Sequence, residues 1–173
     1  NAIGKRVIMD SAKGKLKIFE SPDTLNREAA EFIIQLAQES IASMGKFVLA
    51  LSGGRTPGEL YSLLATPAYS NRVNWRHTFI FWGDERCVPL NDQRNNAFVA
   101  KRLLLDHINI PPANIFRIPV NYKPAEAAIQ YEKNLKDFFG ADLPSFDLEF
   151  LGLGENGHTA SLFPGSVVLK DKK

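Results

Sequence analysis

The sequence predicts an α/β protein whose mainly parallel sheet is covered by helices on both faces. Two short apolar runs, Phe47–Leu51 and Thr78–Trp82, have the length and composition of strands that are buried on both faces. Segments with apolar residues at helical spacing precede and follow these runs. Strands that alternate with helices form βαβ units, and such units build a three-layer α/β/α sandwich around a parallel sheet.

The remaining elements are predicted from local signals. Alternating polar and apolar residues indicate a half-exposed strand at 15–19, and Ser21-Pro22-Asp23 marks the start of a long helix that Gly45 ends. The same criteria predict helices at 57–65, 95–105 and 124–139 and strands at 114–118 and 146–151. There is no internal repeat and no linker rich in Gly, Ser or Pro, so we expect a single domain over residues 1–173.

Composition and charge exclude several classes of protein. The chain has 173 residues, 45% of them hydrophobic and 23% charged, and a net charge of +2 without a stretch dominated by Lys and Arg, which argues against a nucleic-acid surface. Cys87 is the only cysteine, so an internal disulfide is excluded and a cytosolic location is expected. No apolar run reaches the ~18–20 residues of a membrane span. Because the chain stops at Lys173 soon after the apolar Val167-Val168-Leu169, we expect its C-terminal part to be missing.

The first candidate loop is Ser52-Gly53-Gly54-Arg55-Thr56, between the first buried strand and a helix that begins near Pro57. Paired glycines allow close approach of a ligand to the backbone, and a helix N-terminus offers free N–H groups to an anion. The hydroxyls of Ser52 and Thr56 and the guanidinium of Arg55 add hydrogen-bond donors, so we expect this loop to bind a phosphate. The alternative is an ordinary strand-to-helix turn with a Thr cap. A Walker A loop is excluded because the Gly-Lys-Ser/Thr ending is absent.

The second candidate loop, Asp84-Glu85-Arg86, directly follows the second buried strand. Ligands of open parallel sheets bind at the carboxyl ends of the strands, so these charges lie where a ligand is expected. A carboxylate there can orient a sugar hydroxyl or act as a base, and an arginine suits a phosphate. A solvated turn with a surface ion pair explains the same residues equally well.

The third candidate loop contains Gly-Leu-Gly-Glu-Asn-Gly at 152–157, followed by His158. It matches the Gly-x-Gly-x-x-Gly pattern of dinucleotide sites, but Pro164-Gly165 interrupts the helix that such a site requires. A histidine in a polar loop at a ligand-binding edge can take a proton from water near neutral pH, although a lone histidine is more often structural. His77 and His107 lack glycine-rich surroundings, and we interpret both as structural.

Together these loops resemble one enzyme family. Leu-Ser-Gly-Gly-Arg-Thr-Pro at 51–57, Trp-Gly-Asp-Glu-Arg-Cys-Val-Pro at 82–89, Asn-Asp-Gln-Arg-Asn-Asn at 91–96 and Gly-His-Thr-Ala-Ser-Leu-Phe-Pro-Gly at 157–165 are similar to motifs of the glucosamine-6-phosphate isomerase/6-phosphogluconolactonase family, and specifically to its lactonases. The similarity runs from about residue 15 to residue 165, with the motifs in the expected order.

The resemblance implies a modified Rossmann-like fold and a cytosolic hydrolase of the oxidative pentose phosphate pathway. It implies that the enzyme converts 6-phosphogluconolactone to 6-phosphogluconate, without a metal or organic cofactor, and that its partner is this small sugar-phosphate lactone. It assigns the base to His158 and orientation of the lactone to Asp84. It assigns substrate binding to Ser52, Gly53, Gly54, Arg55, Thr56, Arg86, Asn156 and Gly157. Backbone N–H groups of the glycine-rich loop are the expected oxyanion donors.

One position departs from the pattern of the family. Its members often have Asp before Gly-His, where this chain has Asn156, and an amide orients a histidine less strongly than a carboxylate does. Two alternatives remain open: a glucosamine-6-phosphate deaminase/isomerase that uses Asp84 for proton transfer, and a sugar-phosphate-binding module without catalysis. Asp-Glu-Arg at 84–86 and Thr-Ala-Ser-Leu-Phe-Pro at 159–164 favour the lactonase over the deaminase.

Overall fold

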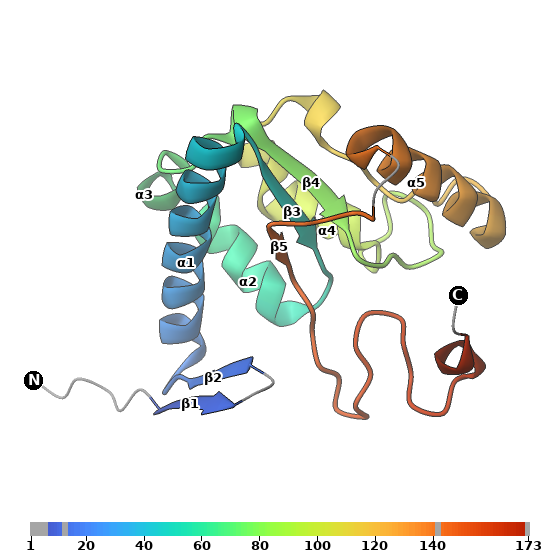
Figure 1. Cartoon of the computed structure of the whole chain (residues 1–173), viewed down its shortest axis with the longest axis horizontal. Helices are drawn as coiled ribbons and strands as arrows, with labels where there is room; N and C mark the ends of the chain where they lie inside the picture. Colours follow the sequence, from blue (N-terminus) through green and yellow to red (C-terminus); the bar gives the residue numbers. More distant parts are fainter. Residues whose placement is uncertain (1–6, 12–13, 141–142, 172–173) are drawn as a thin grey trace, which may run out of the picture.

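A three-stranded parallel sheet in the order β4–β3–β5 forms the centre of the protein (Figure 1). The computed structural model describes residues 7–11, 14–140 and 143–171. Strand β3 (Phe47–Leu51) pairs with β4 (Thr78–Trp82) on one side and with the short β5 (Leu148–Glu149) on the other. Every residue of β3 is buried, as its continuous apolar sequence predicts. In the β3–β4 pair Leu51 lies opposite Trp82, so both strands end at the same level.

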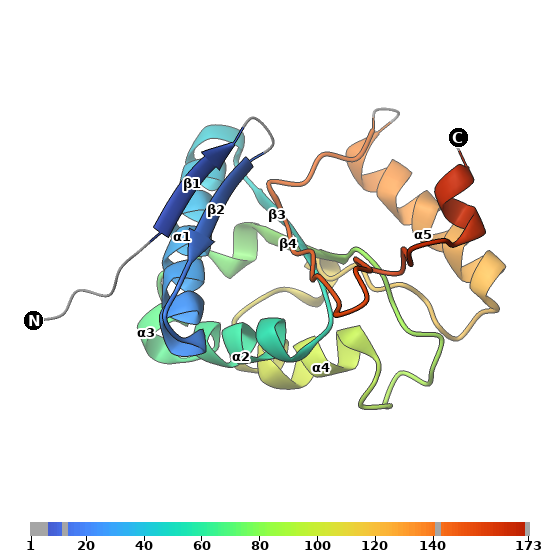
Figure 2. The same ribbon diagram turned by 90° about the horizontal axis from the view of Figure 1, so that it is seen from below.

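Helices cover both faces of this sheet, which confirms the three-layer α/β/α prediction (Figures 1 and 2). On one face, α1 (Pro22–Met44), α2 (Arg55–Leu64) and α4 (Asn96–Leu103) pack against the side chains of Phe47, Leu49, Leu51, Ile80 and Trp82. On the other face, α5 (Pro124–Phe139) covers Val48, Ala50 and Phe81 with an aromatic cluster. Successive side chains of a strand point to opposite faces of the sheet, so the residues of β3 and β4 pack alternately into these two cores.

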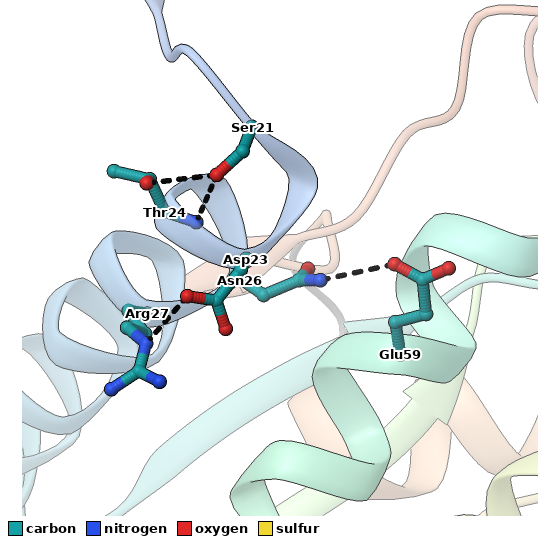
Figure 3. A network of polar contacts seen from close by, with 6 residues as sticks. All are labelled: Ser21, Asp23, Thr24, Asn26, Arg27 and Glu59. Carbon is teal, nitrogen blue, oxygen red and sulfur yellow. Dashed lines mark hydrogen bonds and ion pairs between the residues drawn. The ribbon is translucent and has the colours of Figure 1, made fainter. Parts of the chain in front are cut away.

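Local signals in the sequence determine the bounds and contacts of α1. Ser21 caps the helix, because its Oγ accepts a hydrogen bond from the N–H of Thr24 at 3.2 Å, and Gly45 ends it in the left-handed conformation with φ of 74°. Figure 3 shows this cap and the buried Asn26, whose Nδ2 donates to Glu59 Oε2 of α2 at 3.2 Å. No helix of the described ranges, α1 included, is both long and apolar enough to cross a bilayer.

Several smaller elements surround this centre. Strands β1 (Val7–Ser11) and β2 (Gly14–Ile18) form an antiparallel hairpin that is separate from the main sheet and lies near the start of α1 (Figure 2). The other short elements are α3 (Pro67–Ser70) and the 3₁₀ helices Trp75–His77, Leu105–His107, Pro112–Asn114 and Val167–Lys170. Between β5 and the last of these, the chain is an open loop (Figure 1).

The structure corrects some of the predicted elements. The strand expected at 114–118 is wrong: Pro111 and Pro112 start a 3₁₀ turn there, and only Ile115 forms a single parallel bridge, with Ile80. The strand expected at 146–151 is reduced to Leu148–Glu149. The helices expected at 57–65, 95–105 and 124–139 are present as α2, α4 and α5, and the strand expected at 15–19 is present as β2, shifted by one residue.

Two tyrosine hydroxyls bond the carboxyl ends of the central strands. The hydroxyl of Tyr61 in α2 accepts from the N–H of Ser52 at 3.2 Å and donates to the C=O of the same residue at 2.7 Å. The hydroxyl of Tyr131 in α5 does the same for Trp82, with both distances at 2.9 Å. Burial raises the pKa of both phenols, so they stay protonated. Each hydroxyl therefore bonds the N–H and C=O of one residue, Ser52 or Trp82, in place of a neighbouring strand.

Glu85 fixes the loop after β4 to the start of α4. Its carboxylate accepts from the backbone N–H groups of Asn96 at 2.6 Å, Ala97 at 2.9 Å and Arg86 at 2.7 Å. Burial raises the pKa of this carboxyl, and the three hydrogen bonds oppose the rise. Two of the donors are free N–H groups of the first turn of α4, where a negative charge is favourable. Glu85, the central residue of the Asp84-Glu85-Arg86 motif, therefore has a structural role.

The contact of Tyr61 predicts a specific loss of stability. Tyr61→Phe leaves the N–H and C=O of the Ser52 peptide buried without their partner, so we expect the free energy of unfolding to fall by about 1–3 kcal/mol. Denaturant unfolding measures it. Tyr122→Phe is the matched control, because Tyr122 is 48% exposed and its hydroxyl makes no hydrogen bond within the described ranges; we expect a change within about 0.5 kcal/mol. Equal stability of the two variants would contradict the role of Tyr61.

The contact of Glu85 predicts a second loss. Glu85→Gln has one acceptor oxygen in place of two, and its NH₂ group faces a backbone N–H, so we expect a loss of about 1–3 kcal/mol in the free energy of unfolding. Glu155→Gln is the control, because Glu155 is exposed and makes no hydrogen bond within the described residues. The same unfolding experiment at pH 7 compares the two. A Glu85→Gln protein as stable as the control would show that the carboxylate does not hold α4.

Candidate active site

The three loops predicted from the sequence meet at the carboxyl end of the sheet, as parallel strands that end at one level require. A pocket of about 350 Å³ lies between them. Its walls come from the loop after β3, the loop after β4 and the segment after β5. They include Ser52, Gly53, Gly54, Arg55, Thr56, Asp84, Arg86 and His158, all of which the sequence assigns to the site, together with Pro57, Gly83, Phe150, Leu151, Gly152, Leu153, Gly154, Glu155 and Ala160.

One end of this pocket has the features of an anion site. Helix α2 begins there at Arg55, and no side chain of the described residues caps its first N–H groups. Ser52 is only 7% exposed, and its Oγ has no hydrogen-bond partner within the described part of the chain. Arg55 and Arg86 also make no ion pair there. A buried hydroxyl and two cationic side chains around a helix N-terminus can bind the oxygens of a phosphate.

The backbone at this end fits closely against the neighbouring helix. A Cβ on Gly53 would overlap the side-chain amide of Asn96, the first residue of α4. That amide donates through Nδ2 to the C=O of Asp84 at 3.1 Å and to Asp84 Oδ1 at 3.4 Å. Gly53 is therefore required by the packing of Asn96 between the first two loops. Asn96 therefore contacts both loops; the sequence places it in the motif at 91–96 but predicts no role for its side chain.

A second hollow of about 550 Å³ adjoins the first, between α2 and α4. The two share Gly53, Gly54, Arg55 and Arg86, so these residues form the boundary between them. The further walls of the second hollow are Gly58, Glu59, Ser62, Gln93, Arg94, Asn96, Val99 and Leu103. Of its arginines, Arg94 is paired with Asp92 at 2.7 Å, so Arg55 and Arg86 are the ones available to an anion.

Asp84 lies between the second and third loops. Its Oδ2 accepts a hydrogen bond from Ser161 Oγ at 2.6 Å, and its Oδ1 receives the longer bond from Asn96. Each carboxylate oxygen has a further lone pair, so Asp84 can still accept a bond from a ligand hydroxyl. Ser161 belongs to the motif at 157–165 but is not among the residues that the sequence assigns to the site. Asp84 and Ser161 are 77 positions apart in the chain, and no sequence signal predicts their contact.

His158 is held in a defined orientation at the other end of the pocket. Its Nδ1 lies 2.5 Å from Asn156 Oδ1, which also accepts from the backbone N–H of His158 at 3.3 Å. Since an amide oxygen only accepts, Nδ1 carries the proton and Nε2 of the neutral ring has a free lone pair. The ring stacks on Phe163 with centroids 4.6 Å apart, and a Cβ on Gly154 would overlap it.

Two of the predicted site residues do not line the pocket. Asn156 is assigned to substrate binding by the sequence, and the structure directs its side-chain oxygen to His158. Gly157 adopts φ of 82° in the same turn, and its N–H donates to the C=O of Gly154 at 2.8 Å. In this arrangement both residues shape the loop around His158.

Other candidate groups lie outside the pocket. Nδ1 of His77 lies 3.0 Å from the C=O of Gly45, and Nε2 of His107 lies 2.9 Å from the C=O of Arg102, in keeping with structural roles for both histidines. Cys87 is an exposed free thiol. Within the described ranges, no three His, Cys, Asp or Glu side chains gather as a set of metal ligands.

Comparison with known proteins identifies the family. The family model described as glucosamine-6-phosphate isomerases/6-phosphogluconolactonase matches residues 20–173. A 6-phosphogluconolactonase of a Nostoc species is 33% identical over 162 residues, which cover 91% of this chain and 66% of the relative. That of a Synechocystis species is 42% identical over 135 residues, which cover 76% and 55%.

A solved structure agrees with these matches. The crystal structure of a devB protein is 35% identical to this chain and superposes with a TM-score of 0.80, over 90% of this chain and 64% of that one. The chain thus spans between 55% and 66% of the length of these three relatives. Because the family model matches nearly the whole chain, the chain belongs to the glucosamine-6-phosphate isomerase/6-phosphogluconolactonase family.

Proposed function

We propose that the chain hydrolyses 6-phospho-D-glucono-1,5-lactone to 6-phosphogluconate, a step of the oxidative pentose phosphate pathway. Similar curated proteins carry the name 6-phosphogluconolactonase, and the motifs at 82–89 and 157–165 resemble those of the lactonases. One observation carries the proposal: a histidine with a free Nε2 shares a pocket with an anion site formed by a helix N-terminus. A hydrolase for a phosphorylated lactone requires both.

In this proposal the phosphate binds at the start of α2. Free N–H groups of the helix, the buried hydroxyl of Ser52 and the side chains of Arg55 and Arg86 supply the donors. Thr56 adds a second hydroxyl in the first turn. Fixing the phosphate orients the lactone ring toward the other end of the pocket, and such orientation lowers the barrier by several kcal/mol, within the roughly 7–11 kcal/mol available to well-placed groups.

His158 is the general base. Its Nε2 takes a proton from a water molecule, whose oxygen attacks the lactone carbonyl carbon and forms a tetrahedral oxyanion. Collapse of this intermediate breaks the bond between the carbonyl carbon and the ring oxygen, and the imidazolium of His158 returns the proton to that oxygen. The products are the carboxylic acid and a free hydroxyl, so the step balances without a covalent enzyme intermediate.

The developing oxyanion requires hydrogen-bond donors. In the glycine-rich loop, the N–H groups of Gly154 and Gly157 already donate to carbonyls of the same loop. Those of Gly152, Leu153 and Glu155 make no hydrogen bond within the described residues, and all three residues line the pocket. We assign the oxyanion to this group of N–H donors. Asp84 orients the sugar through a hydroxyl of the lactone.

Loss of the base and loss of a phosphate donor should have separate effects on catalysis and on binding. We expect His158→Ala to lose nearly all lactone hydrolysis and to bind 6-phosphogluconate normally, because only the base is removed. We expect Arg86→Ala to weaken that binding, because a phosphate donor is lost. Rates corrected for spontaneous hydrolysis and calorimetric titration with 6-phosphogluconate measure the two effects.

The controls use a histidine outside the pocket and a second substrate. His107→Ala keeps the activity of the unmodified protein, since His107 contacts only a helix carbonyl within the described residues. Release of ammonia from glucosamine 6-phosphate by the unmodified protein would favour the deaminase alternative. Unchanged turnover in His158→Ala would exclude His158 as the base, and unchanged binding in Arg86→Ala would exclude Arg86 as a phosphate donor.

A further prediction concerns the partner of the base. Asn156→Asp replaces an amide oxygen with a carboxylate of the same shape, and a negative charge beside an imidazole favours the protonated ring. The base is then protonated up to a higher pH, so we expect the acidic limb of the pH–rate profile to move to higher pH. Asn156→Ala, which removes the acceptor of Nδ1–H, should lower the rate at all pH values. An acidic limb that does not move in Asn156→Asp would contradict the contact.

A further inference from the structure

The segment that carries His158 has few attachments to the rest of the fold. Residues 151–166 are all described. Their backbone hydrogen bonds join residues of the segment to one another, as in the reciprocal bonds between Thr159 and Leu162 at 3.2 and 2.9 Å, except that the C=O of Ser166 accepts from the N–H of Leu169 in the following 3₁₀ helix at 3.2 Å. The pair formed by Asn156 and His158 is also internal. The bond from Ser161 Oγ to Asp84 Oδ2, at 2.6 Å, is the one hydrogen bond by which this segment contacts the part of the described chain that precedes it.

The backbone beside Ser161 has an unusual conformation. Ala160 has φ of 48°, and it is the only residue other than glycine with a positive φ among the described residues. A non-glycine residue in this region costs of order 1 kcal/mol or more and persists where surrounding contacts require it. The contacts here are the Thr159–Leu162 pair and the Ser161–Asp84 bond on either side of Ala160. The strained backbone at Ala160 therefore accompanies the orientation that brings Ser161 Oγ to Asp84.

Asp84 is itself firmly placed. The next residue, Glu85, binds the N-terminus of α4, and Asn96 of that helix donates to both the C=O and the carboxylate of Asp84. The acceptor for Ser161 therefore belongs to a loop that is fixed by α4 at several atoms. This contact fixes the position of a segment that, among the described residues, has no other hydrogen bond to the sheet or to helices α1–α5.

We propose that Ser161 is a positioning residue for the hydrolysis: its hydrogen bond to Asp84 places the His158 loop against the loop that carries Arg86. The inference rests on the proposed function, in which His158 is the base. His158 lies three residues before Ser161 in the chain. By bonding Asp84, Ser161 therefore fixes the position of the base. The phosphate site at the start of α2 does not depend on this contact.

This role predicts a split between turnover and binding. In Ser161→Ala the base is no longer held at the distance that proton transfer requires, so we expect kcat to fall by about 10- to 100-fold. The phosphate donors are unchanged, so KM and the affinity for 6-phosphogluconate stay close to those of the unmodified protein. Ser161→Thr keeps the hydroxyl and should recover most of kcat. Ser166→Ala is the matched control, because Ser166 lies in the same segment and its hydroxyl makes no hydrogen bond within the described residues.

A second measurement tests the contact without activity. Hydrogen exchange at the N–H groups of Gly154, Gly157 and Leu162, which bond inside the loop, reports how often this segment opens. We expect faster exchange in Ser161→Ala than in Ser166→Ala or the unmodified protein. Unchanged exchange in Ser161→Ala would overturn the anchoring role, whatever the activity of the chain.

The outcomes separate this inference from the proposed function. If the unmodified protein lacks lactonase activity, the proposed function fails, and the positioning role fails with it. If the unmodified protein is active and Ser161→Ala has the same kcat, or loses affinity in place of kcat, only the positioning role fails. Lowered kcat with retained affinity, recovery in Ser161→Thr and faster exchange together support it.

Discussion

The parallel pairing of β3 with β4 places the first two candidate loops side by side at one edge of the sheet. Leu51 is opposite Trp82, so the two strands end at one level and the loops that follow them begin side by side. The pairing depends on burial of both faces, because three helices cover one face and α5 covers the other. Where the ladder ends, the peptide groups of Ser52 and Trp82 still need partners, and a tyrosine from each helical layer supplies one. The helices that bury the sheet therefore also supply hydrogen-bond partners for the backbone groups at its carboxyl end.

The two ends of the pocket are held by different means. At the anion end, a short loop joins β3 to α2, Gly53 packs on Asn96, and Glu85 fixes the neighbouring loop to α4, so contacts to helices restrain the loops that carry the donors. At the histidine end, an open segment carries the ring, and local bonds define its shape more than its location. In the proposed function, the charged group of the substrate therefore binds at helix ends, whereas the proton-transfer group lies on a loop.

The sequence was informative where local chemistry decides structure. The apolar runs of β3 and β4, the cap at Ser21 and the glycine at Gly45 predicted their elements because each signal acts within a few residues. The strand expected at 114–118 failed because apolar residues there pack on the core without pairing, apart from the single bridge at Ile115. The positions of the three loops followed from strand direction. The contacts of Glu85, Asn96 and Ser161 could not be predicted from the sequence. Each depends on where the fold brings residues that are distant in the chain.

Asn156 and His158 lie in the same turn, and this closeness has a consequence for how such a site changes over evolutionary time. Their geometry is encoded by three consecutive residues, since Gly157 stands between them, and it needs no support from distant parts of the fold. An amide and a carboxylate have the same shape, so an exchange at this one position alters the proton affinity of the ring without repacking its surroundings. For the proposed base, the proton affinity of the ring and its location are therefore specified by separate residues, and selection can adjust the first while leaving the second unchanged.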